Sequence, residues 1–220
     1  MRASLVGLAA AALCVGSAAA QTLEVTSYTL HNYSPGKQFE VTRLVSGPSG
    51  VATVGYLGYQ QSTTGVGARL TLWPVRRLGL ELSLATRSGL RSVLERIPND
   101  PTWYGQGWQS TVNETGLRVA VRALNRPGGR LQFAAGVTRL TFGGLAYYAA
   151  VDSTPLVRRT VTGGAFGASW ITRIKGRMMA SVGLDDIVYH VMPTTRPGDT
   201  VRRWTQHDIA LSTAFVFRVH

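Results

Sequence analysis

The side chains that could carry catalysis in this chain are few and poorly placed for it. No two of the four histidines stand at the spacing that metal ligands usually show. His207 and Asp208 are adjacent and Ser212 follows soon after, so a Ser/His/Asp hydrolase can be imagined. Neighbouring side chains on a strand point to opposite faces, however, which excludes an ordered triad there. We therefore predict no enzymatic activity, no catalytic residue and no metal ligand.

Carboxylates and glycines give two further motifs, and both favour structural interpretations. Asp185 and Asp186 could form a paired-carboxylate site with Glu81, but an Asp185 that balances an arginine inside the fold explains them better. The glycine-rich run 163–167 is not followed by a helical pattern, so it is not a phosphate-binding loop. Its glycines are expected to relieve crowding between closely packed strands. The sequence therefore predicts no cofactor.

The chain is basic, yet it holds few charged residues. Among its 220 residues, 23 Lys and Arg stand against 11 Asp and Glu, a formal net charge of +12, and charged residues make up only 15%. Average soluble domains hold about 25%. No basic helix, zinc module or RNA-binding motif accompanies the arginines, so a nucleic-acid partner is not expected. The single cysteine, Cys14, excludes a disulfide framework and a cysteine-based zinc site.

The beginning of the chain has the organisation of an export signal. A short basic start precedes an apolar run over residues 5–16, and three alanines follow where signal peptidase would cut. We predict a signal peptide over residues 1–20, with cleavage before Gln21. Lipoprotein cleavage before Cys14 is a less favoured alternative, because bulky Leu13 precedes that cysteine. No later run reaches the ~18 apolar residues of a membrane helix.

The rest of the chain alternates aliphatic residues with polar or small ones. In the last segment, Leu211, Phe215 and Phe217 share one face, whereas Asp208 and Ser212 share the other. A period of two indicates strands, and no helical period fits these windows. Eight strands are predicted, over residues 37–46, 66–72, 78–87, 116–123, 130–142, 160–173, 176–189 and 208–220.

Short and long connections alternate strictly between these strands. Three tight turns are predicted at residues 73–77, 124–129 and 174–176, and four long loops at 47–64, 88–109, 143–159 and 191–202. Membrane β-barrels follow this rule, with short turns on the periplasmic side and long loops outside. The predicted fold class is therefore all-β, an eight-stranded antiparallel transmembrane β-barrel of up-and-down topology over residues 37–220. Residues 21–36 are predicted to form an N-terminal periplasmic segment.

On these features the chain resembles the small bacterial outer-membrane β-barrels of the OmpA, OmpX and OmpW group. The likeness rests on the alternating segments and on the Phe-rich final strand 208–220, covers nearly the whole mature chain, and includes no specific functional motif. Such barrels commonly end on an aromatic residue, whereas this chain ends on His220. The resemblance implies a location in the bacterial outer membrane. It also implies lipid, glycolipid and the barrel assembly machinery as partners, and a monomeric state.

The predicted function is structural anchoring or interaction through the surface loops, and narrow passage of a small solute is a third role that the sequence allows. An eight-stranded barrel is just wide enough for side chains to fill, so a general diffusion pore is not expected. Two alternatives stay open. One is an outer-membrane enzyme that modifies lipids. The other is a soluble periplasmic binder like a lipocalin, in which the aliphatic face would point inward.

The register of one hairpin predicts a charge network in the lumen. If residues 74–76 form the turn, Trp73 faces Arg77 and Arg69 lies opposite Glu81, within reach of an ion pair. Charged residues on the polar faces of the other strands extend the network. The predicted members are Arg69, Glu81, Glu114, Arg118, Arg122, Arg177, Asp185 and Arg218.

A second set of arginines lies on or beside the long loops. Guanidinium groups bind phosphate in a bidentate way, so these residues are expected to contact phosphates of the outer-leaflet glycolipid. An equally acceptable interpretation is that they only keep the loops solvated. The set consists of Arg87, Arg91, Arg96, Arg158, Arg159, Arg202 and Arg203.

Overall fold

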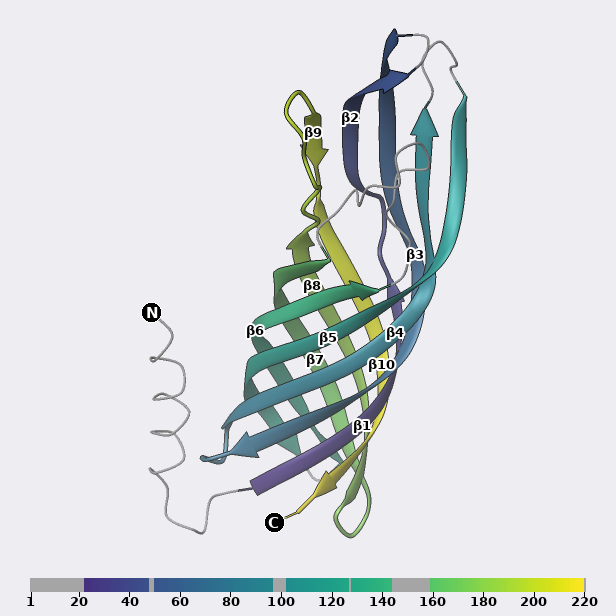
Figure 1. Ribbon diagram of the computed structural model, residues 1–220. Coiled ribbons are helices and arrows are strands. Elements are labelled where there is room, and N and C mark those ends of the chain that lie inside the picture. The colour runs from purple at the N-terminus through teal and green to yellow at the C-terminus, as the bar shows by residue number, and fades with distance from the viewer. Residues whose placement is uncertain (1–21, 48–49, 97–101, 127, 144–158, 220) are drawn as a thin grey trace.

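The computed structural model describes residues 22–47, 50–96, 102–126, 128–143 and 159–219 (Figure 1). The predicted signal peptide therefore lies outside the described residues. Within those ranges, no helix is long and apolar enough to cross a membrane. The strands are β1 Thr22–Tyr33, β2 Lys37–Gly47, β3 Gly50–Trp73, β4 Leu78–Arg96, β5 Trp103–Arg126, β6 Gly129–Gly143, β7 Thr160–Lys175, β8 Met178–His190, β9 Thr200–Arg203 and β10 Thr205–Arg218.

Eight of these strands close into an antiparallel barrel, which confirms the predicted fold class. Hydrogen bonds join them in the ring order β1, β10, β8, β7, β6, β5, β4 and β3, and pairing between β1 and β3 closes the ring. The tilted strands of this ring occupy the lower half of Figure 1. Closure leaves the barrel section without an unpaired edge, so its backbone polar groups are satisfied internally, as a bilayer requires.

The first strand of the barrel is β1, and here the sequence-based prediction is wrong. Residues 21–36 were expected to form a periplasmic segment and residues 37–46 the first barrel strand. Instead, β1 pairs with both β10 and β3 along almost its whole length. The alternation of β1 is hard to recognise because its outward face carries polar Ser27, Thr29 and His31 instead of aliphatic residues.

The strand over residues 37–46 exists, but it belongs to an extension beyond the barrel. There β2 pairs with the distal part of β3 and with the short strand β9. The expected loops 47–64 and 88–109 are also largely strand, because β3 and β4 remain paired up to Gly55 and Arg96. Figure 1 shows β2 and the ends of β3, β4 and β5 rising above the ring. We call this region the distal extension.

The outward face of the barrel is aliphatic and the inward face is polar or small, as the alternation predicts. Leu84 is 54% exposed, Val119 is 47% exposed and Phe215 is 57% exposed, whereas Glu81 and Arg118 are buried. A soluble barrel would show the opposite arrangement, with its aliphatic face inside. The exposed aliphatic belt is the surface that a lipid bilayer would cover.

The β3–β4 turn is longer than the predicted one. The two strands end at Trp73 and begin again at Leu78, so four residues connect them instead of three. One of the four is Pro74, which has no N–H group to extend the ladder. The ladder begins with Leu72 facing Leu80, whereas the predicted register placed Leu78 opposite Leu72, so the register is displaced by two residues. A displacement of two leaves every side chain on its predicted face.

Candidate functional site

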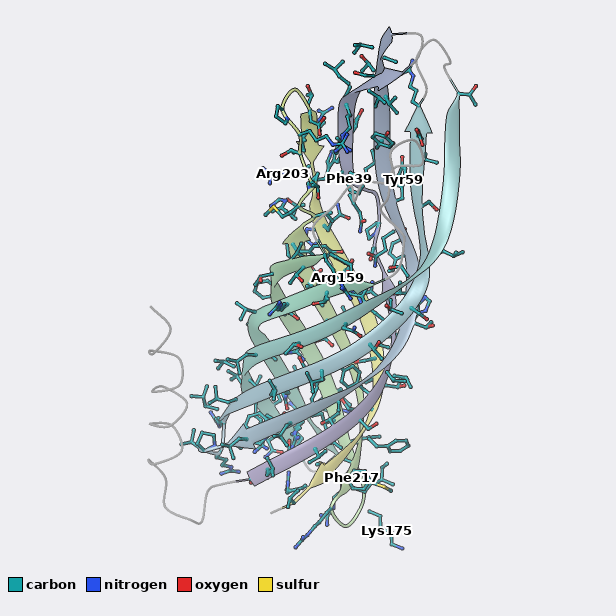
Figure 2. All side chains as sticks on the ribbon, in the orientation of Figure 1. Phe39, Tyr59, Arg159, Lys175, Arg203 and Phe217 are labelled. Carbon is teal, nitrogen blue, oxygen red and sulfur yellow. The ribbon has the colours of Figure 1, made fainter. Side chains whose placement is uncertain are left out.

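Charged and polar side chains form three layers inside the barrel. The end that carries the short turns is the periplasmic end of such barrels, and Figure 2 shows Lys175 and Phe217 there. Arg203 and Phe39 lie toward the opposite end. The three layers follow one another from the periplasmic end to the distal extension.

The first layer centres on Glu24, a buried residue of β1. Arg130 Nη1 donates to Glu24 Oε1 at 2.7 Å, and a second Arg130 nitrogen contacts Oε2. Arg122 Nη2 and Arg218 Nη2 lie 3.2 Å and 3.4 Å from Oε1. Trp73 Nε1 donates to Oε2 at 3.0 Å, and the Arg122 guanidinium stacks 3.6 Å from the centre of the Trp73 ring. One carboxylate thus holds three guanidinium groups.

The second layer joins residues of β3, β4, β5 and β8. Arg118 Nε donates to Glu81 Oε1 at 2.7 Å, and Arg118 Nη1 also pairs with Asp185. Arg69 Nη2 donates to Asp185 Oδ2 at 2.6 Å, whereas Arg69 Nε lies 4.0 Å from Glu81 Oε1. The Arg69 guanidinium also stacks over the ring of Tyr28, with 4.3 Å to the centroid.

Gly167 leaves the space that the ion pairs of the second layer occupy. A Cβ atom at Gly167 would lie 2.3 Å from Asp185 Oδ1 and 3.2 Å from Arg118 Nη1. The first distance is shorter than real Cβ contacts and the second is tighter than most, so a side chain there would displace the ion pair. Gly167 therefore relieves crowding, as expected for the run 163–167, because it leaves room for Asp185 and Arg118.

The third layer lies where the barrel meets the distal extension. Arg87 of β4 pairs with Asp208 of β10, and both side chains are fully buried. Ser34 Oγ donates to Asp208 Oδ1, and Tyr189 Oη donates to the same oxygen at 3.3 Å. Gln60 Nε2 donates to Ser34 Oγ at 3.0 Å. Polar side chains from β3, β4, β8 and β10 and from the end of β1 therefore meet around one carboxylate.

An apolar cluster lies above the third layer. A cluster of buried side chains fills the space between the upper barrel and the distal extension. It comprises Phe39, Val41, Val54, Tyr56, Val112, Leu140, Phe142, Val161, Ala165, Ile187, Tyr189 and Val191. Residues of β2 and of the distal part of β3 thereby pack on the inward faces of β5 to β8.

The predicted lumen network is only partly brought together. Arg69, Glu81, Arg118 and Asp185 share the second layer, whereas Arg122 and Arg218 meet Glu24 in the first. Glu114 faces inward on β5 but belongs to none of these ion pairs. Arg177 is exposed at the periplasmic turn, where Nη1 donates to the Val219 carbonyl at 3.1 Å.

The arginines predicted to contact glycolipid are not all exposed. The assignment of Arg87 to the outer surface is wrong, because β4 continues beyond it and keeps its side chain inside, against Asp208. Arg96, Arg159, Arg202 and Arg203 are exposed near the far ends of strands. Arg158 and the side chain of Arg91 lie outside the described residues.

Glu24 is absent from the predicted site, because the sequence pattern predicts a periplasmic segment where β1 lies. Two features of residues 22–33 could have revealed it. Strand-forming residues are dense there, and the glutamate stands at a position whose side chain points inward when residues alternate along a strand. The predicted site also lacks Asp208 as the partner of Arg87. Among the described residues, no group of three or more His, Cys, Asp or Glu side chains could hold a metal ion.

No protein-family model and no curated protein matches the chain. Among solved structures, the outer membrane protein OprG from Pseudomonas aeruginosa superimposes with a TM-score of 0.62 at 12% identity, over 91% of this chain and 97% of that one. The outer membrane protein AlkL, solved by solid-state NMR in DMPC bilayers, superimposes with a TM-score of 0.53 at 11% identity, over 93% of each chain. The chain therefore has the fold of the small eight-stranded β-barrels of bacterial outer membranes.

Proposed function

We propose that this protein is an outer-membrane barrel with a closed lumen, and that its activity lies at its surfaces. The observation that carries the proposal is that the lumen ion pairs join strands far apart in the ring. Glu24 on β1 binds Arg130 on β6, four places away in a ring of eight. Arg118 on β5 and Asp185 on β8 are three places apart. Such pairs cross the lumen instead of lining it.

The other contents of the lumen support the same function. Arg87 on β4 reaches Asp208 on β10, also three places away, and the apolar cluster lies above that pair. A charge left unpaired in a closed interior costs several kcal/mol, so these groups hold one another in place. An ion that crosses the barrel would have to break each layer in turn.

Conductance in planar bilayers tests the closed lumen. We expect no stepwise conductance from the wild-type barrel. Replacing both members of a crossing pair, Arg118→Ala with Asp185→Ala, removes the bridge without changing the net charge and should produce measurable steps. Arg202→Ala with Arg203→Ala, both on the exposed strand β9, is the control and should stay silent. Pore-like conductance in the wild-type protein would contradict the proposal.

A surface role in glycolipid binding is the second element of the proposal. The exposed Arg159, Arg202 and Arg203 support it, and so does Arg139, which is exposed on the outward face of β6. Arginine binds phosphate in a bidentate way. Neutralising Arg158 together with the first three should lower binding of a phosphorylated glycolipid more than binding of its dephosphorylated form. An equal loss for both, or no loss, would leave only the solvating role.

A further inference from the structure

The periplasmic mouth of the barrel holds an unusual concentration of positive charge. A pocket of about 370 Å³ lies there, between the ends of β5, β6, β7, β8 and β10. Its lining includes six arginines, namely Arg122, Arg126, Arg130, Arg173, Arg177 and Arg218. A second pocket of about 270 Å³ shares Arg122 and Arg126 and adds Arg76 and Arg77.

The carboxylates near this pocket do not balance its charge. Glu24 is the acidic residue that pairs with its arginines, and it contacts Arg122, Arg130 and Arg218. Among the described residues, no carboxylate pairs with the other three. Arg173 Nε and Arg177 Nη1 bind backbone carbonyls at 3.1 Å instead. Six guanidinium groups thus line the pocket, whereas Glu24 carries one negative charge and contacts three of them.

Two buried guanidinium nitrogens in the pocket lining also lack a partner. Neither Arg122 Nε nor Arg130 Nε makes a hydrogen bond, although each is shielded from solvent. Buried donors without acceptors are costly, and so are like charges held close together. An anion with several oxygen atoms would relieve both costs at once, because it accepts from more than one guanidinium fork.

The volume and lining of the pocket indicate which kind of anion it could hold. Its volume lies at the lower end of the range of about 300–1,000 Å³ that ligand sites occupy. The lining also contains the apolar side chains of Ile171 and Met179, which pack with Val216. We propose that this pocket binds a phosphate-bearing molecule from the periplasmic side, either a free phosphate compound or the headgroup of an anionic inner-leaflet lipid. The site would function whether or not the lumen conducts.

Pyrophosphate is the probe for a free phosphate compound. The barrel is placed in phosphatidylcholine nanodiscs at about 0.15 M salt, which screens charges more than about 8 Å apart. Pyrophosphate is then titrated by calorimetry. The test variant is Arg126→Gln with Arg173→Gln, because both side chains are exposed and neither contacts Glu24. The control is Lys37→Gln with Arg196→Gln, two exposed residues near the opposite end, which removes the same charge and leaves the proposed glycolipid contacts in place. The Kd of the test variant should rise about tenfold, the effect of roughly one lost charge-assisted hydrogen bond, and that of the control by less than twofold.

Lipid retention tests the second source of phosphate. The same three proteins are taken from nanodiscs that contain a minor fraction of phosphatidylglycerol, and the phosphatidylglycerol that stays bound is counted by native mass spectrometry. Retention by the wild type and the control, with loss in the test variant, would identify a lipid headgroup as the ligand. Pyrophosphate binding with the same dependence would identify a soluble ligand. If the wild type shows neither, or if test and control variants lose binding equally, the proposed site is wrong. Boiling-sensitive gel mobility of all three proteins verifies that they are folded.

Discussion

Arg69 and Glu81 lie diagonally across the β3–β4 ladder, displaced by two residues from direct opposition. Arg69 faces Ser83 and Glu81 faces Thr71, so the closest approach of Arg69 Nε to Glu81 Oε1 is 4.0 Å. Each of the two has a closer partner. Arg118, directly opposite Glu81 on the neighbouring strand β5, binds Glu81, and Asp185 binds Arg69 from across the lumen. The diagonal contact between Arg69 and Glu81 is therefore weaker than the contacts that each makes with its closer partner, and this difference can be measured.

Double-mutant cycles at Glu81 should rank its two arginines. Glu81→Gln leaves the buried Arg118 guanidinium short of an acceptor and should cost about 3–5 kcal/mol of unfolding free energy. Adding Arg118→Gln should recover a large part of that loss, whereas adding Arg69→Gln should recover little, because Asp185 holds Arg69. Urea unfolding in lipid vesicles provides the free energies. Equal coupling of Glu81 to both arginines would contradict the observed geometry.

Arginine on the outward face should destabilise the barrel according to its depth. Leu80 is two residues from the start of β4, whereas Leu84 is six residues from it and nearer to the bilayer midplane. Leu84→Arg should cost about 2–4 kcal/mol and Leu80→Arg less, since the penalty falls to about 0–1 kcal/mol near the interface. Val119→Arg, on the same face of β5, should also destabilise.

Ala120→Arg is the control for the effect of depth in the bilayer. Ala120 is fully buried on the inward face, so the result there depends on space inside the barrel and not on lipid. Unfolding in vesicles and boiling-sensitive mobility report both effects. If Leu84→Arg left insertion and mobility unchanged, the outward face of β4 would not contact lipid.

The faces of the strands could be predicted from sequence, because side chains alternate with a period of two. The register at the Pro74 turn differs by two residues from the predicted one, yet Arg69 and Glu81 lie on the inward face as predicted, because a displacement of two residues leaves each side chain on the same face. The number of barrel strands was also predicted correctly. One of the eight predicted strands was wrong, however, because residues 37–46 were counted as a barrel strand in place of β1.

The contacts across the lumen could not be predicted in the same way. Arg87 and Asp208 are 121 positions apart, and nothing in the local pattern relates them. Their contact depends on ring closure and on how far β4 continues past the barrel. Glu24 was lost for a related reason, since a strand with polar residues on both faces gives no amphipathic signal. Partners in a closed barrel are set by its geometry as a whole.

Gly167 should be intolerant of any side chain. A Cβ atom there would overlap Asp185 Oδ1, so Gly167→Ala should break the second layer and cost about 3–5 kcal/mol, as other losses of a buried pair do. The matched control on the same strand is Gly164→Ala. Its Cβ would meet only the Phe166 ring, at 3.3 Å, and that side chain faces outward and can shift. Equal unfolding free energies for the two variants would show that the second layer does not depend on this space.

The distal extension should depend on the buried ion pair between Arg43 and Asp199. Arg43 of β2 and Asp199, which precedes β9, are almost fully buried, with Nη2 at 3.1 Å from Oδ2. Arg43 Nε donates to the same carboxylate at 3.2 Å, and Nη2 donates to the Thr194 carbonyl at 3.0 Å. These contacts join β2 to the chain segment between β8 and β9. Removing the arginine leaves a buried carboxylate without its partner, a loss of about 3–5 kcal/mol.

Arg43→Ala should therefore loosen the distal extension while the barrel stays closed. Amide hydrogen exchange should accelerate in β2 and β9, whereas protection in β6 and β7, which lie entirely within the ring, should be unchanged. Arg202→Ala is the matched control, because it also removes an arginine from the extension but from an exposed position on β9. It should alter exchange little. Faster exchange throughout the barrel in Arg43→Ala would mean that the extension and the ring unfold as one unit.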